Sequence, residues 1–156
     1  MSVAVLLSLG GNVGDRKALI DEAVARIAAL PETTLRARSS YYRTEPVGPV
    51  VQPWFVNIAI EVETGMARAA LAAACRQIEG DLGRDRSAEI SWGPRPIDID
   101  VVAYGAVSEI DARAFVLVPL AEIAADVQVG GMTIGALAAR AGSSGVEKLD
   151  WPLARP

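Results

Sequence analysis

The stretch FVNIAIEVET, residues 55–64, decides the fold, because apolar and polar side chains alternate along it. Branched apolar residues occupy every second position from Val56 to Val62. The positions between and after them hold Asn57, Ala59, Glu61 and Glu63. Successive side chains of a strand point to opposite faces of a sheet, so the pattern predicts a strand with one buried face.

Helical periodicity is found on both sides of this strand. Apolar residues recur at i, i+3, i+4 and i+7 from Leu19 to Leu30, which predicts an amphipathic helix that begins near Asp15 and stops at Pro31. Residues 67–82 follow the same spacing, with Cys75 at a core position. We expect Cys75 to be a buried apolar residue rather than a reactive thiol.

Further strands complete a regular order of elements. Apolar runs predict strands at residues 3–9 and 97–104, and residues 35–43 are β-like. The resulting order, β-α-β-β-α-β, is that of an α+β, ferredoxin-like fold, in which helices pack on an antiparallel sheet.

A C-terminal extension is expected after this unit. Residues 114–120 predict a short strand, residues 120–125 a helical turn, and residues 133–141 a small helix. Neither a repeat nor a linker interrupts the chain, so we expect a single domain over residues 1–156.

The composition excludes several classes of protein. Apolar residues make up 51% of the chain and charged residues 22%, which is typical of a folded globular domain. The net charge of −4 disfavours a general nucleic-acid binder, and no apolar run is long enough to span a membrane. The start, MSVAVLLSLGGN, lacks the features of a signal peptide, so we expect a cytoplasmic protein.

Histidine is absent from the chain, and Cys75 is its single cysteine. Serine–histidine–aspartate and cysteine–histidine nucleophiles are therefore excluded, as are histidine-ligated zinc and an internal disulfide. A bound metal must be held mainly by oxygen atoms, which favours a hard cation such as Mg²⁺.

The motif WGPRPIDID, residues 92–100, contains the candidate metal ligands. Asp98 and Asp100 are two positions apart on a predicted strand, so both carboxylates leave the same face. A divalent cation between them would relieve their repulsion, and Mg²⁺ typically takes one or two carboxylates. The alternative is a solvated polar strand face, and the pair taken alone favours that alternative.

Nearby arginines change this balance. Arg84, Arg86 and Arg95 lie close to the two aspartates in the sequence. Guanidinium groups bind phosphate oxygens through paired hydrogen bonds, and cations beside a metal are typical of phosphoryl-transfer sites. Arginine is also the preferred cation of this chain throughout, which is the alternative explanation. The neighbouring carboxylates favour phosphate binding.

Residues 41–57 include candidates for binding a flat heterocycle. Phe55 offers a ring for stacking, Asn57 offers a donor and an acceptor, and Phe115 is a candidate for the opposite face of the ring. The composition is equally compatible with an alternative, in which Phe55 is a residue at the edge of the core and Asn57 is an amide on a strand surface. The stretch GGNVG, residues 10–14, matches neither a dinucleotide motif nor a P-loop and predicts a tight turn.

Six motifs together resemble one known family, the 6-hydroxymethyl-7,8-dihydropterin pyrophosphokinases of folate synthesis. They are LGGNVGD, SSYYRTEPVG, QPWFVN, RQIE followed by LGRDR, WGPRPIDID and RAFVLVPLAEIA, and they occur in family order over nearly the whole chain. The resemblance implies a ferredoxin-like α+β enzyme that transfers pyrophosphate from ATP, the co-substrate, to the hydroxymethyl group of the pterin, with two Mg²⁺ ions. AMP is released.

The resemblance also implies roles for individual residues. Asp98 and Asp100 match the metal-binding aspartates, and with Arg84 and Arg95 they form the expected catalytic set. The expected nucleotide-binding residues are Glu79, Arg84, Arg86, Trp92, Arg95 and Arg113. The expected pterin-binding residues are Thr44, Pro46, Val47, Phe55, Asn57 and Phe115. Partners are expected to be the pterin and ATP, with no nucleic acid and no membrane, and the protein a monomer or weak dimer.

The segment of residues 101–114 departs from the family pattern. The family usually has a longer stretch there, with a Pro-His segment whose histidine contacts the ATP phosphates, and this chain has no histidine. Three hypotheses follow. The first is an active pyrophosphokinase. The second is a divergent relative with a weakened or lost ATP site, acting as a pterin-binding protein or in another pterin pathway. The third is an interaction module without a small-molecule site.

Overall fold

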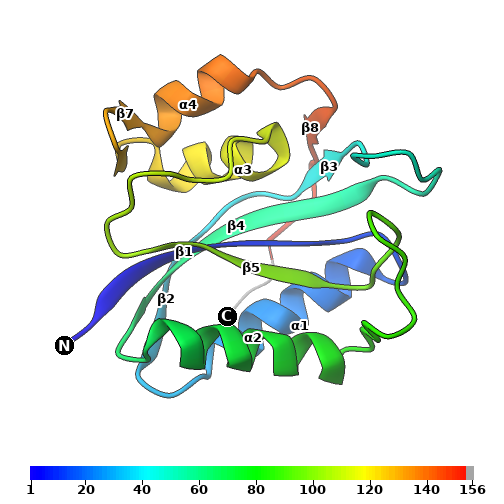
Figure 1. Cartoon of the computed structure of the whole chain (residues 1–156), viewed down its shortest axis with the longest axis horizontal. Coiled ribbons are helices and arrows are strands. Elements are labelled where there is room, and N and C mark those ends of the chain that lie inside the picture. Colours follow the sequence, from blue (N-terminus) through cyan, green and yellow to red (C-terminus); the bar gives the residue numbers. More distant parts are fainter. Residues whose placement is uncertain (154–156) are drawn as a thin grey trace.

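The computed structural model describes residues 1–153 (Figure 1). The strands are β1 (Val3–Gly11), β2 (Thr33–Arg38), β3 (Tyr42–Thr44), β4 (Phe55–Thr64), β5 (Asp98–Tyr104), β6 (Gln128–Val129), β7 (Met132–Thr133) and β8 (Val146–Lys148). The helices are α1 (Arg16–Ala28), α2 (Arg68–Asp81), α3 (Ala114–Ala124) and α4 (Ile134–Ala141).

The main sheet is antiparallel and has the strand order β5-β1-β4-β3-β8, and β2 also pairs with β4. The order confirms the α+β, ferredoxin-like fold. The expected β-like stretch at 35–43 is divided between β2 and β3. At the division, the Ser39 N–H donates to the Ala59 carbonyl, but the Ala59 N–H donates to the Ser39 hydroxyl in place of a backbone carbonyl. The C-terminal extension adds β8 to the sheet, a strand too short to show alternation in the sequence.

Helices cover both faces of the sheet (Figure 1). Between the sheet and the α1–α2 layer lies a large apolar core that includes Leu7, Ile58, Ile60 and Cys75. Between the sheet and the α3–α4 layer lies a second, smaller core. It contains Leu6, Ala59, Ala103, Val116, Leu120, Ala124, Val129 and Ile134. The buried position expected for Cys75 is confirmed, and burial raises the pKa of its thiol to about 12.

The expectation of a single buried face on residues 55–64 is wrong. Asn57 and Ala59 are 6% and 0% exposed, although they lie on the face that the sequence pattern marks as polar. Helix α3 packs on this face and places Val116 and Leu120 in one cluster with Ala59. The central strand is therefore buried from both sides near its start.

The expected short strand at 114–120 followed by a helical turn is also wrong. Residues Ala114–Ala124 form the single helix α3, with Pro119 inside it. Four of its first seven residues, Val116, Leu117, Pro119 and Leu120, are buried, so the helix shows no polar stripe. Apolar residues on most sides resemble a strand when read from periodicity alone. The small helix expected at 133–141 is confirmed as α4, which Thr133 caps.

Helix α1 begins where the sequence predicts. The Asp15 side chain accepts a hydrogen bond from the backbone N–H of Ala18 at 3.1 Å, which satisfies one of the free donors at the helix start. Helix α2 ends before Gly83, whose φ of 104° suits glycine. Every helix within residues 1–153 is too short or too polar to cross a membrane.

Candidate active site

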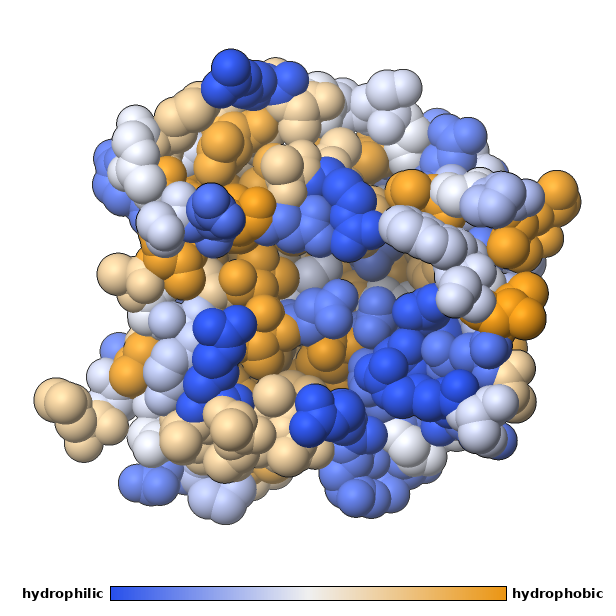
Figure 2. All heavy atoms as spheres, viewed as in Figure 1, coloured by the Kyte–Doolittle hydropathy of each residue, from blue (hydrophilic) through white to orange (hydrophobic). Residues whose placement is uncertain are grey.

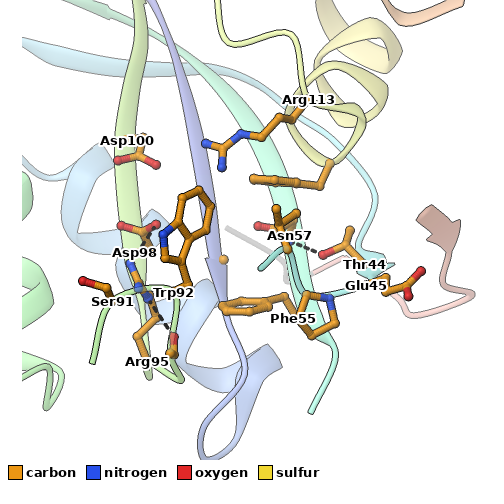
Figure 3. A pocket seen from close by; sticks show the side chains of 15 residues that line it. Thr44, Glu45, Phe55, Asn57, Ser91, Trp92, Arg95, Asp98, Asp100 and Arg113 are labelled. Carbon is orange, nitrogen blue, oxygen red and sulfur yellow. Dashed lines mark hydrogen bonds and ion pairs between the residues drawn. The ribbon is translucent and has the colours of Figure 1, made fainter. Parts of the chain in front are cut away.

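A pocket of about 340 Å³ opens at one end of the sheet, between the α3–α4 layer and two loops, residues 45–54 and 82–97 (Figure 3). Its size suits a small-molecule ligand. Figure 2 shows hydrophilic residues beside exposed apolar side chains at this end of the molecule. The exposed apolar side chains of the two loops are Val47, Val51, Ile90 and Trp92.

The register of the sheet brings the two halves of the pocket together across Gly10. This residue of β1 pairs with Asn57 of β4 on one side and with Asp98 of β5 on the other. Opposite partners in an antiparallel ladder project to the same face, so the amide and the carboxylate flank Gly10. A Cβ at Gly10 would lie 2.0 Å from Asn57 Oδ1, so only glycine fits here.

Asp98 and Asp100 form the acidic wall of the pocket (Figure 3). Asp98 accepts a hydrogen bond from Arg84 Nη1 at 2.9 Å, and its second oxygen lies 3.8 Å from Arg95 Nη1. The Asp100 carboxylate has no hydrogen-bond partner within residues 1–153. Enclosure by the protein, and then the negative charges of Asp98 and Glu79, raise the pKa of Asp100 to about 6.

The acidic wall fits a hard divalent cation. It consists of two carboxylates on one strand face, and one of them has a raised pKa and no protein partner. No group of three or more carboxylate, histidine or cysteine ligands is present in the described part of the chain. Mg²⁺ suits such a site, because it keeps several water and phosphate ligands and needs only one or two carboxylates.

The opposite side of the pocket has aromatic and amide groups. Phe55 begins β4, and Phe115 lies in the first turn of α3. Asn57 donates a hydrogen bond from Nδ2 to Thr44 Oγ1, and both residues are almost fully buried. The Asn57 Oδ1 atom accepts no hydrogen bond within residues 1–153, so the amide offers an acceptor to a ligand.

Asn12 joins the segments around the pocket, although the sequence analysis gave it no role. Its Nδ2 donates to Gln52 Oε1 and to the Pro53 carbonyl, each at 2.9 Å. Its Oδ1 accepts from the Arg95 N–H at 3.0 Å, and its own N–H donates to the Arg95 carbonyl at 3.0 Å. Gln52 in turn donates to the Trp92 carbonyl at 2.6 Å. The sequence signal that could have indicated this role is the position of Asn12, directly after two glycines at the end of a predicted strand.

Arg84 lies behind the acidic wall rather than in the pocket. Its side chain is 2% exposed and is paired with three carboxylates: Glu79 at 2.7 Å, Glu89 at 2.7 Å and Asp98 at 2.9 Å. Buried charges need such partners. The hydrogen bond from Arg84 also lowers the pKa of Glu89. Arg84 therefore fixes one oxygen of Asp98 from behind.

Most of the expected site residues line one pocket. They are Thr44, Pro46, Val47, Phe55, Asn57, Trp92, Arg95, Asp98, Asp100, Arg113 and Phe115. Three expected nucleotide-binding residues, Glu79, Arg84 and Arg86, do not line the pocket. The Glu79 side chain is 1% exposed; one of its carboxylate oxygens pairs with Arg84, and the other lies 2.9 Å from Arg86 Nη2. Four residues of the lining are not among the expected site residues, and these are Gly10, Glu45, Ser91 and Gly93.

Comparison with protein families gives one match over most of the chain. The family described as 7,8-dihydro-6-hydroxymethylpterin-pyrophosphokinase matches residues 6–125. A 2-amino-4-hydroxy-6-hydroxymethyldihydropteridine pyrophosphokinase of Methylorubrum extorquens is 43% identical, and the alignment covers 92% of this chain and 97% of that protein. Proteins of the same name from Bacillus subtilis and Pseudomonas aeruginosa are each 35% identical to this chain. The first alignment covers 82% of this chain and 82% of the B. subtilis protein, and the second covers 93% of this chain and 96% of the P. aeruginosa protein.

Solved structures show the same fold. An HPPK-DHPS in complex with substrates superposes with a TM-score of 0.67 at 10% identity, and the match covers 90% of this chain. The Plasmodium falciparum HPPK-DHPS superposes with a TM-score of 0.59 at 11% identity, again over 90% of this chain. This chain spans 43% and 41% of the length of those two proteins.

Proposed function

The chain belongs to the 7,8-dihydro-6-hydroxymethylpterin-pyrophosphokinase family, and on this premise we propose that its pocket has a pterin side and a nucleotide side. The protein is a transferase of folate biosynthesis. It transfers pyrophosphate from ATP to 6-hydroxymethyl-7,8-dihydropterin and yields the pterin diphosphate and AMP. The observation that supports the division is the position of Gly10, with an amide on one flank and a carboxylate on the other.

The pterin side consists of rings and of groups that can bond to a ring edge. Phe55 and Phe115 would stack on the two faces of the heterocycle. Asn57, held by Thr44, would bond to its edge, because Oδ1 is left without a donor. The bare Gly10 leaves room for the Asn57 amide, whose Oδ1 fills the space that a side chain at position 10 would need. Pro46 and Val47 would close the outer rim.

The nucleotide side consists of charged groups. Asp98 and Asp100 would hold Mg²⁺, and we propose two ions because the acidic wall leaves both carboxylates facing the pocket. Bound Mg²⁺ supplies charge neutralisation for the phosphates. Arg95 and Arg113 would contact the phosphates, and Trp92 would cover the nucleotide.

For Arg84 the proposed role is to position Asp98. Its guanidinium is fully enclosed and already paired with three carboxylates, which leaves little freedom to meet a phosphate directly. A direct contact of Glu79, Arg84 or Arg86 with the nucleotide stays a prediction, because none of the three lines the pocket.

The reaction itself needs little covalent help from the protein. The hydroxymethyl oxygen attacks the β-phosphorus in line, while the bond from that phosphorus to the oxygen bridging to the α-phosphorus breaks. AMP leaves with that oxygen, and the hydroxyl proton passes to water. A loose transition state asks mainly for positioning and for neutralised charge, which the arginines and the acidic wall provide.

The divergent pterin-binding alternative is not favoured. A relative named for the enzyme activity is 43% identical over nearly its whole length. The segment between β5 and α3, residues 105–113, leads into α3 and delivers Arg113 and Phe115 to the pocket. We propose that the protein is a monomer or a weak dimer.

Substitution of Asp98 tests the division of the site. We expect Asp98→Ala to lower turnover by at least about a hundredfold, because it removes a metal ligand and a charge at the phosphates. The dissociation constant for the pterin, measured by titration calorimetry, should stay within about threefold. Asp126→Ala, an exposed change in the loop after α3, is the control. Loss of pterin binding in parallel with turnover would contradict two separate sides.

A further inference from the structure

The segment between β5 and α3, residues 105–113, holds an ion pair at the edge of the pocket. Arg113 Nη2 lies 2.6 Å from Asp111 Oδ2, and Arg113 Nε donates to both carboxylate oxygens at 3.0 and 3.2 Å. The backbone N–H of Arg113 also donates to Asp111 Oδ1 at 3.0 Å. Asp111 therefore fixes both the main chain and the side chain of Arg113.

The ion pair fixes the direction of the guanidinium. Its central carbon lies 4.6 Å from the centre of the Phe115 ring, so the group is also held from below by an aromatic face. Asp111 occupies the Nε–Nη2 edge, and within residues 1–153 the Nη1 atom has no hydrogen-bond partner. Figure 3 shows the guanidinium extending across the pocket toward Asp100.

Without Asp111, the carboxylates of Asp98 and Asp100 would attract the Arg113 guanidinium. The negative charges of Asp100 and Asp98 act on its guanidinium and, after the hydrogen bond to Asp111, help to raise its pKa. A long arginine side chain released from Asp111 would be drawn toward these two carboxylates. It would then occupy the place where a cation and phosphate oxygens are needed.

We propose that Asp111 is a positioning residue for the nucleotide: it holds the Arg113 guanidinium against Phe115, off the acidic wall, with one edge open to a phosphate. The proposal rests on the proposed function, since it assigns the nucleotide to this side of the pocket. Asp111 lies in the segment between β5 and α3, two residues before Arg113. Orienting one flexible side chain before binding is worth about threefold to tenfold in affinity.

The test is Asp111→Asn, measured with a non-hydrolysable ATP analogue in the presence of Mg²⁺. Asparagine keeps the Oδ1 acceptor for the Arg113 N–H, so the start of α3 is preserved, but it loses the charge and the paired contact. We expect the dissociation constant of the analogue to rise about threefold to tenfold, the Mg²⁺ concentration for half-maximal binding to rise, and pterin affinity to stay within twofold.

Glu63→Gln is the matched control. Glu63 pairs with Arg36 at 2.8 Å with similar exposure, but it lies near the far end of β4, away from the pocket. This variant should change neither affinity. An Arg113→Ala background supplies a second control: if Asp111 acts through Arg113, adding Asp111→Asn there should have no further effect on nucleotide affinity.

The outcomes separate this proposal from the proposed function. Unchanged or tighter nucleotide binding in Asp111→Asn, or an equal loss in the Arg113→Ala background, would overturn the role of Asp111 even if the wild-type protein releases AMP. A different result would support the role of Asp111 and overturn the proposed function. In it, the wild-type protein binds the analogue and Asp111→Asn lowers that affinity as expected, but the wild-type protein releases no AMP. Thermal unfolding within about 2 °C of wild type would show that the variant is folded.

Discussion

Asp100 is the residue at which function and stability conflict most directly. Its side chain is partly exposed, but the protein atoms around it and the negative charges of Asp98 and Glu79 raise its pKa to about 6. A carboxylate with a raised pKa binds a proton in the folded state that it loses in the unfolded state. Its contribution to stability is therefore full at a pH below about 4 and is lost as the pH rises through 6. At neutral pH the charged form is retained at a cost that metal binding can offset.

Asp100→Asn should therefore stabilise the metal-free protein at pH 7.5. The gain is about 1 kcal/mol or less, reduced because the side chain is partly open to solvent, and it corresponds to a melting temperature roughly 2–4 °C higher. The difference from wild type should shrink as the pH falls to about 4.5. Thermal unfolding at both pH values checks this, and adding Mg²⁺ should stabilise wild type more than the variant. A variant that melts below wild type at pH 7.5 would contradict the account.

Gly10 is the residue where the sheet allows no side chain. We expect Gly10→Ala to raise the pterin dissociation constant at least about tenfold, because the new Cβ would lie 2.0 Å from Asn57 Oδ1 and displace the amide. Gly131→Ala is the control, since a Cβ there meets no atom within 4 Å. Calorimetric titration with the pterin is the measurement. Equal pterin binding in both variants would show that the Asn57 amide does not contact the pterin.

Some residue roles follow from the sequence and others do not. Alternation along a strand is enough to place Asp98 and Asp100 on one face, as predicted. Arg84 is different, because its position is decided by which carboxylates surround it, and these come from α2, the following loop and β5. The same holds for Asn12, whose partners lie about 40 and 83 positions away in the chain.

Among the elements, α3 links the pocket to the third strand of the sheet. Its first turn supplies Phe115, and its last turn is joined to β3 through Glu122. The Glu122 carboxylate accepts hydrogen bonds from the Ser40 N–H at 3.0 Å, the Ser40 hydroxyl at 2.7 Å and the Tyr42 hydroxyl at 2.7 Å. These contacts hold the helix on the strand that also carries Thr44.

Glu122→Ala should lower the stability of the protein by about 1–2 kcal/mol, because it leaves the partners of the carboxylate unpaired. The melting temperature should fall by roughly 3–6 °C. Glu122→Gln keeps one acceptor and should lose about half as much. Calorimetric unfolding of the two variants is the check. A melting temperature of Glu122→Ala within 1 °C of wild type would mean that these bonds do not anchor α3.

Element prediction succeeds where an element has one buried side. Helices α1 and α2 were predicted because each packs one stripe on the sheet and leaves the other in water. Helix α3 was missed because it is buried on several sides, so its apolar residues show no period. Strand β8 was missed because three residues are too few to show alternation, and only pairing with β3 makes it a strand.

In the whole molecule, two helical layers bury both faces of one sheet, and the pocket lies at the end where loops from both layers meet (Figure 1). The nine residues 105–113 join β5 to α3, and the acidic wall, the two phenylalanine rings, Arg95 and Arg113 all line this pocket. The central claim is therefore that this compact site, in a chain without histidine, carries out the full transfer.

The most direct test is product analysis with the wild-type protein. ATP and 6-hydroxymethyl-7,8-dihydropterin are incubated with the protein and Mg²⁺, and AMP and the pterin diphosphate are measured by chromatography. The account predicts equimolar AMP and pterin diphosphate, with none formed when Mg²⁺ is chelated or in Asp98→Ala. Formation of ADP in place of AMP, or AMP no higher than in Asp98→Ala, would contradict it.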